Sequence, residues 1–418
     1  MAPYWTGSFK KKNRSAFLSF LFIASLFLPM ALAADSDGDG VQDSSDDCPW
    51  AAGTSTVDKD GCPDRDGDGT SDFNDGWSIG NPNFQNEFTT SSSNDYYGVA
   101  FSPNGEFIVT GSEDDFVRIW NASTWTNVRS VNTGTNVNGV DFSPDGQYVA
   151  AALDDDTIGI YYSSNLTSIH GVISVDVGGG DQVNSVAFSP DSSSVAVAIG
   201  RSGNGGTNGE VAVINVITGT ELYAVNPNGE DRFYDLAWSP DGMHMALAGN
   251  GDIYIVNTTT RATTWTITNP PAAVNAIAWS PDGNFISMCG GWEGQSASFD
   301  MYQYGSGSWS RIWEKTTTTS CASTAFSSDG SQVIAGMHWY GADGATARVY
   351  QSDTGTQVDS FSGPQPGGCT SGNNNNCGTL YGAAWSPDST HIVTAHGRND
   401  EGVYYWFADI DADNDGYN

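Results

Sequence analysis

Apolar and polar residues alternate in short segments from Tyr96 to Phe407, and turn-forming residues separate the segments. Val137–Phe142 and Glu106–Gly111 are two such segments, Asp252–Val256 belongs to an aromatic-rich type, and Thr220–Val225 belongs to a more polar type. A period of two predicts half-buried strands. Four successive strands of these types predict one antiparallel four-stranded sheet per repeat.

A short motif, an aromatic residue followed by Ser-Pro-Asp-Gly or a close variant, occurs seven times in this region. The motifs begin at Phe101, Phe142, Phe188, Trp238, Trp279, Phe326 and Trp385. Pro presets φ, Asp bonds nearby backbone and Gly accepts a positive φ, so the motif predicts a tight turn. Spacings of 41 to 59 residues with strand-like content predict an all-β fold, a seven-bladed β-propeller over residues 96–407.

The seventh repeat lacks a fourth strand, because Gly402–Trp406 runs directly into an Asp-rich tail. The segment Phe84–Thr90, within a linker of residues 77–95, precedes the first repeat and suits a strand. Pairing the two ends closes the ring and removes exposed sheet edges. We therefore expect an N-terminal strand to complete the seventh blade.

These repeats resemble WD-repeat propellers and the related Pro-Asp repeats of periplasmic Tol-type propellers, over about residues 84–407. The likeness is closest from Gly111 through Asp114 to Trp120, and Asn121 stands where the terminal Asp of the motif is usual. The chain departs from the pattern by lacking the Gly-His pair that supports the family's buried His–Asp network. The resemblance implies a scaffold that binds a partner, without identifying the partner.

Residues 1–34 have the form of a secretory signal peptide. A basic patch with Lys10 and Arg14 precedes the apolar run Ala16–Met30, and the small-x-small site Ala31–Ala33 follows. An uncleaved anchor is the alternative, because the run approaches the length of a membrane span. We expect a secreted or cell-surface protein, with the periplasm as an alternative, and no membrane insertion after cleavage.

The chain is strongly acidic, with a formal net charge of −34. After cleavage 11 basic and 49 acidic residues remain, which gives −38. Such a field repels nucleic acid and attracts cations, so nucleic-acid binding is excluded. Adaptation to a saline habitat is an alternative explanation of the acidity.

Two Asp-rich motifs between residues 35 and 76 have calcium-loop spacing: Asp at loop positions 1, 3, 5, 9 and 12, and Gly at position 6. Hard carboxylate oxygens suit Ca²⁺, and position 7 offers its carbonyl oxygen. The predicted ligands are Asp35, Asp37, Asp39, Val41, Asp43, Asp46, Asp64, Asp66, Asp68, Thr70, Asp72 and Asp75. Asp411, Asp413 and Asp415, within residues 408–418, begin a third such loop. A solvated acidic linker is the alternative.

The flanks of these loops do not suit an EF-hand, because Pro49, Gly53 and Gly61 break helices. Cys48-Pro and Cys62-Pro, which follow the acidic stretches, make residues 35–76 similar to thrombospondin type 3 repeats of exported linkers. The resemblance implies a rigid, calcium-filled rod braced by a Cys48–Cys62 disulfide.

The six cysteines of an exported chain are expected to form disulfides. Sequence proximity suggests Cys48–Cys62, Cys289–Cys321 and Cys369–Cys377, which is one of several connectivities that six cysteines allow.

Extra length in the repeats falls mostly after second and fourth strands, at Gly200–Gly209, Gly290–Ser298, Met337–Ala345 and Ser362–Thr379. These connections emerge at one end of a propeller, and insertions on one face often mark a binding face. The ligand-face candidates there are Trp292, His338, Trp339 and Tyr340. Covering the core is the alternative role for these side chains.

No catalytic motif stands out. The five histidines, His170, His244, His338, His391 and His396, form no spaced metal motif, and no nucleophile elbow or phosphate loop is present. We expect a non-enzymatic, calcium-binding recognition protein whose partner is an extracellular protein or glycan, as in adhesion. The alternatives are a hydrolase or lyase acting on an extracellular polymer, and a structural envelope or filament subunit that self-assembles.

Overall fold

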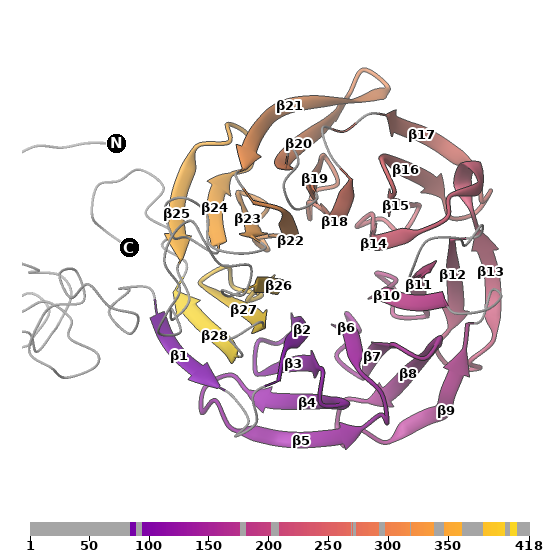
Figure 1. Ribbon diagram of the computed structural model, residues 1–418, viewed down its shortest axis with the longest axis vertical. Coiled ribbons are helices and arrows are strands. Elements are labelled where there is room, and N and C mark those ends of the chain that lie inside the picture. Colours follow the sequence, from indigo (N-terminus) through magenta and orange to yellow (C-terminus); the bar gives the residue numbers. More distant parts are fainter. Residues whose placement is uncertain are drawn as a thin grey trace, which may run out of the picture.

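The computed structural model describes residues 84–88, 94–175, 181–201, 209–268, 270, 273–291, 297–317, 319–337, 347–361, 379–397 and 402–407. Seven four-stranded antiparallel sheets surround a central axis as the blades of a β-propeller (Figure 1). The predicted all-β, seven-bladed architecture is therefore confirmed. In the described part of the chain, helix is confined to the 3-10 turn η1 (Pro227–Gly229).

We number the blades 1 to 7 from β2 onwards, and each blade runs outward from the axis. The first, innermost strands are β2 (Tyr96–Phe101), β6 (Val137–Phe142), β10 (Asp181–Phe188), β14 (Phe233–Trp238), β18 (Val274–Trp279), β22 (Cys321–Phe326) and β26 (Thr379–Trp385). The second strands are β3 (Phe107–Ser112), β7 (Tyr148–Leu153), β11 (Ser194–Arg201), β15 (His244–Gly249), β19 (Phe285–Gly290), β23 (Gln332–Met337) and β27 (His391–Gly397).

The third strands are β4 (Phe116–Asn121), β8 (Thr157–Tyr162), β12 (Glu210–Asn215), β16 (Asp252–Asn257), β20 (Ala297–Gly305), β24 (Ala347–Gln351) and β28 (Gly402–Phe407). The outermost strands are β5 (Asn127–Asn132), β9 (Ser168–Ser174), β13 (Glu221–Val225), β17 (Thr263–Thr268), β21 (Ser308–Thr317), β25 (Gln357–Phe361) and, in blade 7, β1 (Phe84–Phe88).

The ring is closed by its two ends. β1 pairs antiparallel with β28, with Phe84 opposite Trp406 and Phe88 opposite Val403. Blade 7 therefore has the strand order β1-β28-β27-β26, so the N-terminal strand supplies its fourth strand. The closure predicted from the missing strand of the seventh repeat is confirmed.

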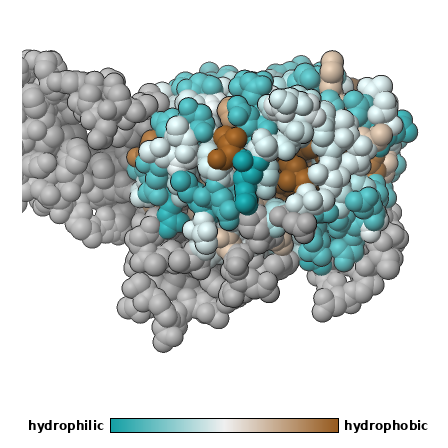
Figure 2. All heavy atoms as spheres, turned by 90° about the horizontal axis from the view of Figure 1, so that it is seen from above, coloured by the Kyte–Doolittle hydropathy of each residue, from teal (hydrophilic) through white to brown (hydrophobic). Residues whose placement is uncertain are grey.

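The hydrophobic core lies in layers between neighbouring blades. Val109 and Ile119 of blade 1, for example, share one cluster with Val149 and Leu153 of blade 2. Second strands such as β7 are almost wholly buried, whereas outer strands such as β5 alternate between exposed and half-buried residues. Hydrophilic residues dominate the side of the molecule in Figure 2, and hydrophobic residues there form small separate patches.

The seven motif turns share one hydrogen-bond pattern. The Ser hydroxyl donates to the Asp carboxylate two residues later, or to Asn104 in blade 1, over 2.5–2.7 Å. In blade 2 the turn ends at Gly146, whose φ of 73° is a conformation that glycine adopts without strain. These turns define what we call the Pro-Asp-Gly end of the propeller, which also carries the connections between third and fourth strands.

The same turns link neighbouring blades. Pro103 of blade 1 lies against Gly146 of blade 2, where an added Cβ would come within 3.3 Å of Pro103 Cγ. In blade 3 Ser192 replaces the glycine, with φ of 61°, and its hydroxyl accepts a hydrogen bond from the N–H of Asp145 at 3.0 Å. A contact between adjacent turns is thus kept even where the motif changes.

A disulfide joins blades 5 and 6. Cys289 on β19 and Cys321 on β22 are fully buried, and their Cα atoms are 5.1 Å apart. This is the pair that sequence proximity suggested. The other suggested pairs, Cys48–Cys62 and Cys369–Cys377, lie outside the described residues.

Candidate functional site

All residues predicted to bind calcium or a ligand lie outside the described part of the chain. This holds for the signal peptide, the calcium loops of residues 35–76, the third loop from Asp411, and the ligand-face candidates Trp292, His338, Trp339 and Tyr340. These assignments stay predictions. Among the residues that are described, no group of three or more His, Cys, Asp or Glu could hold a metal ion.

An aromatic cleft opens between blades 4 and 5 at the Pro-Asp-Gly end, opposite the end that the sequence indicated. Its volume of about 310 Å³ is at the lower limit of ligand-sized pockets, which begin at roughly 300 Å³. Its lining consists of Ser239, Pro240, Asp241, His244, Trp265, Trp279, Asp282, Gly283, Tyr304 and Trp309. We call this set the aromatic cleft.

The aromatic rings form a continuous chain across the two blades, in which two pairs are edge-to-face and the Tyr304–Trp309 pair is tilted. Ring centroids are 5.3 Å apart for Trp265 and Tyr304, 5.4 Å for Tyr304 and Trp309, and 5.5 Å for Trp309 and Trp279. His244 packs against Trp265 at 5.6 Å. Tyr304 is 39% exposed and the three indoles are partly exposed, so these rings reach the surface.

A long hairpin in blade 5 builds one wall of the cleft. β20 and β21 pair as far as Gly305 and Ser308, and their tip extends toward β17 of blade 4 (Figure 1). Trp265 Nε1 donates to the carbonyl oxygen of Gly307 in that tip at 3.0 Å. The hydrogen bond holds the hairpin against blade 4 and fixes Tyr304 and Trp309 beside Trp265.

The cleft carries negative charge. The Ser239 hydroxyl and the N–H of Met243 donate to Asp241 Oδ1 and hold the pKa of that carboxyl below its usual value. For Asp282, burial opposes ionisation, but hydrogen bonds from Ser280 and Asn284 outweigh it and also lower the pKa. Both carboxylates are therefore ionised at neutral pH, and the lining contains no Lys or Arg.

The central channel is a second cavity, of about 240 Å³, lined by the innermost strands of all seven blades. Its amide side chains already have partners, because Asn138, Asn184 and Asn275 each donate to a carbonyl oxygen of the following blade at 2.6–3.0 Å. Asp235, also in the lining, accepts the N–H of Ile277 in blade 5 at 3.0 Å. These bonds tie the blades together around the axis, so the channel serves the fold.

The described histidines have packing roles. His396 is fully buried, with Nε2 2.8 Å from Thr394 Oγ1, and His391 is half-buried against Tyr405. His170 bonds the carbonyl oxygen of Val216 at 2.9 Å. Only His244 lines the aromatic cleft; His338 lies outside the described residues.

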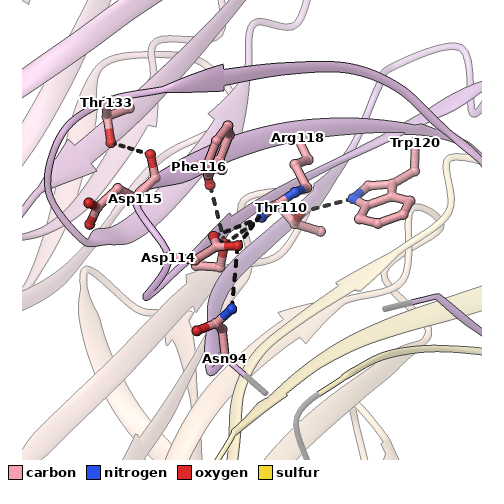
Figure 3. Close-up of polar contacts among 9 residues, drawn as sticks. Asn94, Thr110, Asp114, Asp115, Phe116, Arg118, Trp120 and Thr133 are labelled. Atoms are coloured by element: carbon pink, nitrogen blue, oxygen red, sulfur yellow. Dashed lines mark hydrogen bonds and ion pairs between the residues drawn. The ribbon is translucent and has the colours of Figure 1, made fainter. Parts of the chain in front are cut away.

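Blade 1 contains a polar network of its own (Figure 3). Asp114 accepts hydrogen bonds from Arg118 Nη1 at 2.8 Å, from Ser112 Oγ at 2.6 Å and from Asn94 Nδ2 at 3.5 Å, and Trp120 Nε1 donates to Thr110 Oγ1 at 2.9 Å. Burial opposes ionisation of Asp114, but the hydrogen bonds from Arg118 and Ser112 and the charge of Arg118 keep its pKa below the usual range. The carboxylate is thus held by Arg, Ser and Asn side chains.

Three segments of the chain match a known repeat family, in agreement with this architecture. The WD domain, G-beta repeat family (WD40) matches residues 83–121, 125–161 and 262–295. The matched segments run from β1 to β4, from β5 to β8 and from β17 to β19. The chain therefore carries WD40 repeats in a seven-bladed β-propeller, a scaffold that generally mediates protein interactions. No curated protein matches the chain.

The described residues include no helix of the length and apolar character needed to cross a membrane.

The aromatic cleft was not predicted from the sequence, because the loop insertions that indicated a binding face lie at the opposite end of the propeller. The signal lies in blade 5, where β20 and β21 extend over nine and ten residues and a short Ser306-Gly307 turn replaces the longer turn of other blades. Aromatic residues on both arms of that hairpin, Tyr304 and Trp309, could have pointed to it.

Proposed function

We propose that this chain is an exported, calcium-binding, non-enzymatic recognition protein whose propeller binds an extracellular protein or glycan. The WD40 propeller supplies the rigid scaffold. The leader-like N-terminus and the two Asp-rich loops of the sequence support export and calcium binding.

The aromatic cleft is the observation that carries the recognition role. Trp265, Trp279, Tyr304 and Trp309 bring large, partly exposed rings from two blades together in one recess. Tryptophan and tyrosine offer rigid contact area with little loss of side-chain entropy, and they are enriched where binding energy concentrates. A hairpin lengthened only to cover the core would not need to bring its rings to the surface.

The charge state of the cleft supports binding over hydrolysis. A general acid at neutral pH needs a raised pKa, whereas the pKa values of Asp241 and Asp282 are both lowered. Asp300, whose pKa burial raises to about 6, has no exposed surface and lies against Arg311 and Tyr302. No described carboxyl in the cleft is poised to donate a proton.

The test is a binding screen of the purified chain, without its first 34 residues, in calcium-containing buffer. Panels of extracellular glycans and of surface proteins are probed with wild type, Trp265→Ala and Tyr162→Ala. Tyr162 is the matched control, because it is a 44% exposed aromatic residue at the same end of the propeller and outside the cleft. Binding lost in Trp265→Ala and kept in Tyr162→Ala supports the proposal; turnover of a polymer in the panel contradicts it.

Calcium binding is tested separately by calorimetric titration of the same chain. We expect saturable binding of about two ions, with a Kd of order 10⁻⁴–10⁻³ M as in other extracellular modules. Absence of binding would show that the Asp-rich segments are solvated linkers and not calcium sites.

A further inference from the structure

The chain covers several of its partly exposed aromatic rings with its own cations. Arg129 lies 5.1 Å from the ring centroid of Phe107, Arg261 lies 4.7 Å from that of Tyr223, and Lys315 lies 5.9 Å from that of Trp313. A cation over an aromatic face is attracted by the ring quadrupole. The described surface of this protein thus uses the contact repeatedly.

A cleft of similar construction lies between blades 3 and 4, and we call it the earlier cleft. Between blades 3 and 4, Asp191, Tyr223 and Trp238 occupy the positions that Asp241, Trp265 and Trp279 occupy between blades 4 and 5. In that earlier cleft Arg261, from the turn between β16 and β17, covers Tyr223.

In the aromatic cleft the corresponding turn, between β20 and β21, carries no basic residue. It instead brings Tyr304 and Trp309, which add two rings to the site. No described Lys or Arg lies over any of the four large rings of the cleft. The cleft therefore has more aromatic faces than its neighbour, keeps two carboxylates, and lacks the internal cation.

We propose that the aromatic cleft receives the side-chain cation of a lysine or arginine presented by a partner protein. The inference rests on the proposed recognition function and specifies the chemistry of its partner. The cation would lie over a ring face of the aromatic cleft, as Arg261 lies over Tyr223, and near the carboxylate of Asp241. The net charge of −34 favours the approach of a basic segment.

The hydrogen-bonding atoms of the cleft favour a cation over a sugar. Trp265 and Trp279 Nε1 already donate to Gly307 and Gly283 carbonyl oxygens, and Asp282 accepts hydrogen bonds with both carboxylate oxygens. Trp309 Nε1 has no hydrogen-bond partner, but it is buried and so cannot reach a hydroxyl group of a ligand. A sugar needs several free donors and acceptors for its hydroxyl groups, whereas a cation needs negative charge and ring faces.

The test uses small probes with a matched neutral analogue. Nα-acetyl-lysine N-methylamide and Nα-acetyl-arginine N-methylamide are titrated at low salt into the chain without its first 34 residues, and tryptophan fluorescence and calorimetry report binding. Nα-acetyl-norleucine N-methylamide is the uncharged analogue of the lysine probe. We expect the charged probes to bind at least about tenfold more tightly than norleucine, and to weaken as salt is added.

Three variants locate the site. Trp265→Ala should abolish binding of the charged probes, and Asp241→Asn, which keeps the Oδ1 acceptor of the turn but removes the charge, should weaken it at least about threefold. Asp329→Asn makes the same change in the turn of blade 6, outside the cleft, and should leave binding unchanged. Asp241→Asn keeps the test valid if Trp265→Ala fails to fold.

Equal affinity for norleucine and lysine probes, no effect of Asp241→Asn, or no binding of either charged probe would overturn the proposal. Binding of methyl glycosides in place of the charged probes would overturn it in favour of a glycan site. If the probes fail but a protein or glycan from the screen still binds the chain, the recognition function stands and only the cation assignment falls.

Discussion

The disulfide between blades 5 and 6 makes a quantitative prediction about stability. Cys289 and Cys321 are 32 residues apart in sequence, and both are fully buried between two blades. In the chain-entropy description, closing a loop of this length removes about 3.7 kcal/mol of unfolded-state freedom at 25 °C. The Cys289→Ala/Cys321→Ala variant should lose at least that much unfolding free energy, because the truncated side chains also leave unfilled volume.

The assay is urea unfolding followed by tryptophan fluorescence, with thermal melting alongside. For a domain of this size a loss of that order lowers Tm by roughly 5 °C. The control is Ser287→Ala/Thr324→Val, which removes a 2.8 Å hydrogen bond across the same interface without altering any cross-link. We expect the control to lose only about 1 kcal/mol.

Equal losses in the two double variants would refute the reasoning, because they would show that the cross-link adds no more than one inter-blade contact. A loss in the disulfide variant below about 1 kcal/mol would do the same.

Three further predictions concern the turns, two partly buried carboxylates and the ring closure. Gly146→Ala should cost more unfolding free energy than Gly134→Ala. The positive φ costs about 1–2 kcal/mol at each position, and at Gly146 the added Cβ also meets Pro103. Equal costs in urea unfolding would show that the Pro–Gly contact does not contribute to stability. Burial raises the pKa of Asp141 to about 7 and that of Asp235 to about 6, so the folded state binds protons more tightly than the unfolded state. The unfolding free energy should therefore rise as the pH falls from 8 toward 5, and Asp141→Asn/Asp235→Asn should flatten this slope. A wild-type unfolding free energy that falls over the same pH range would contradict the prediction. Deleting residues 1–90 removes β1 and exposes the edge of β28, so light scattering should show concentration-dependent association, and a monomer as stable as the wild-type chain would contradict the closure.

The fold could be predicted from the sequence because its signals are local and repeated. The segment Val137–Phe142 was expected as a strand and forms β6 with those bounds, and Gly402–Trp406 forms all but the last residue of β28. The Ser-Pro-Asp-Gly motif specifies its own turn through a hydrogen bond that spans only two residues. Ring closure followed from counting strands, which required no knowledge of side-chain packing.

The candidate site could not be predicted in the same way, because it depends on contacts between blades. Trp265 and Trp309 are far apart in the sequence, and each lies in an alternating segment like that of any other outer strand. They meet only because the β20–β21 hairpin is long enough for Gly307 to reach Trp265. The hydrogen bonds that lower the pKa of Asp241 are predictable from the turn, but its place beside four aromatic rings is not.

The most direct test of the account is to observe which of the 14 tryptophans respond when a charged probe binds. The indole N–H resonances of a ¹⁵N-tryptophan-labelled chain are assigned by single substitution and followed during titration with Nα-acetyl-lysine N-methylamide. We predict saturable shifts for Trp265, Trp279 and Trp309, and unchanged positions for Trp120 and Trp406, which are buried in blades 1 and 7. Shifts confined to tryptophans outside the cleft, or no saturable shift at all, would contradict the assignment of the aromatic cleft as the binding site.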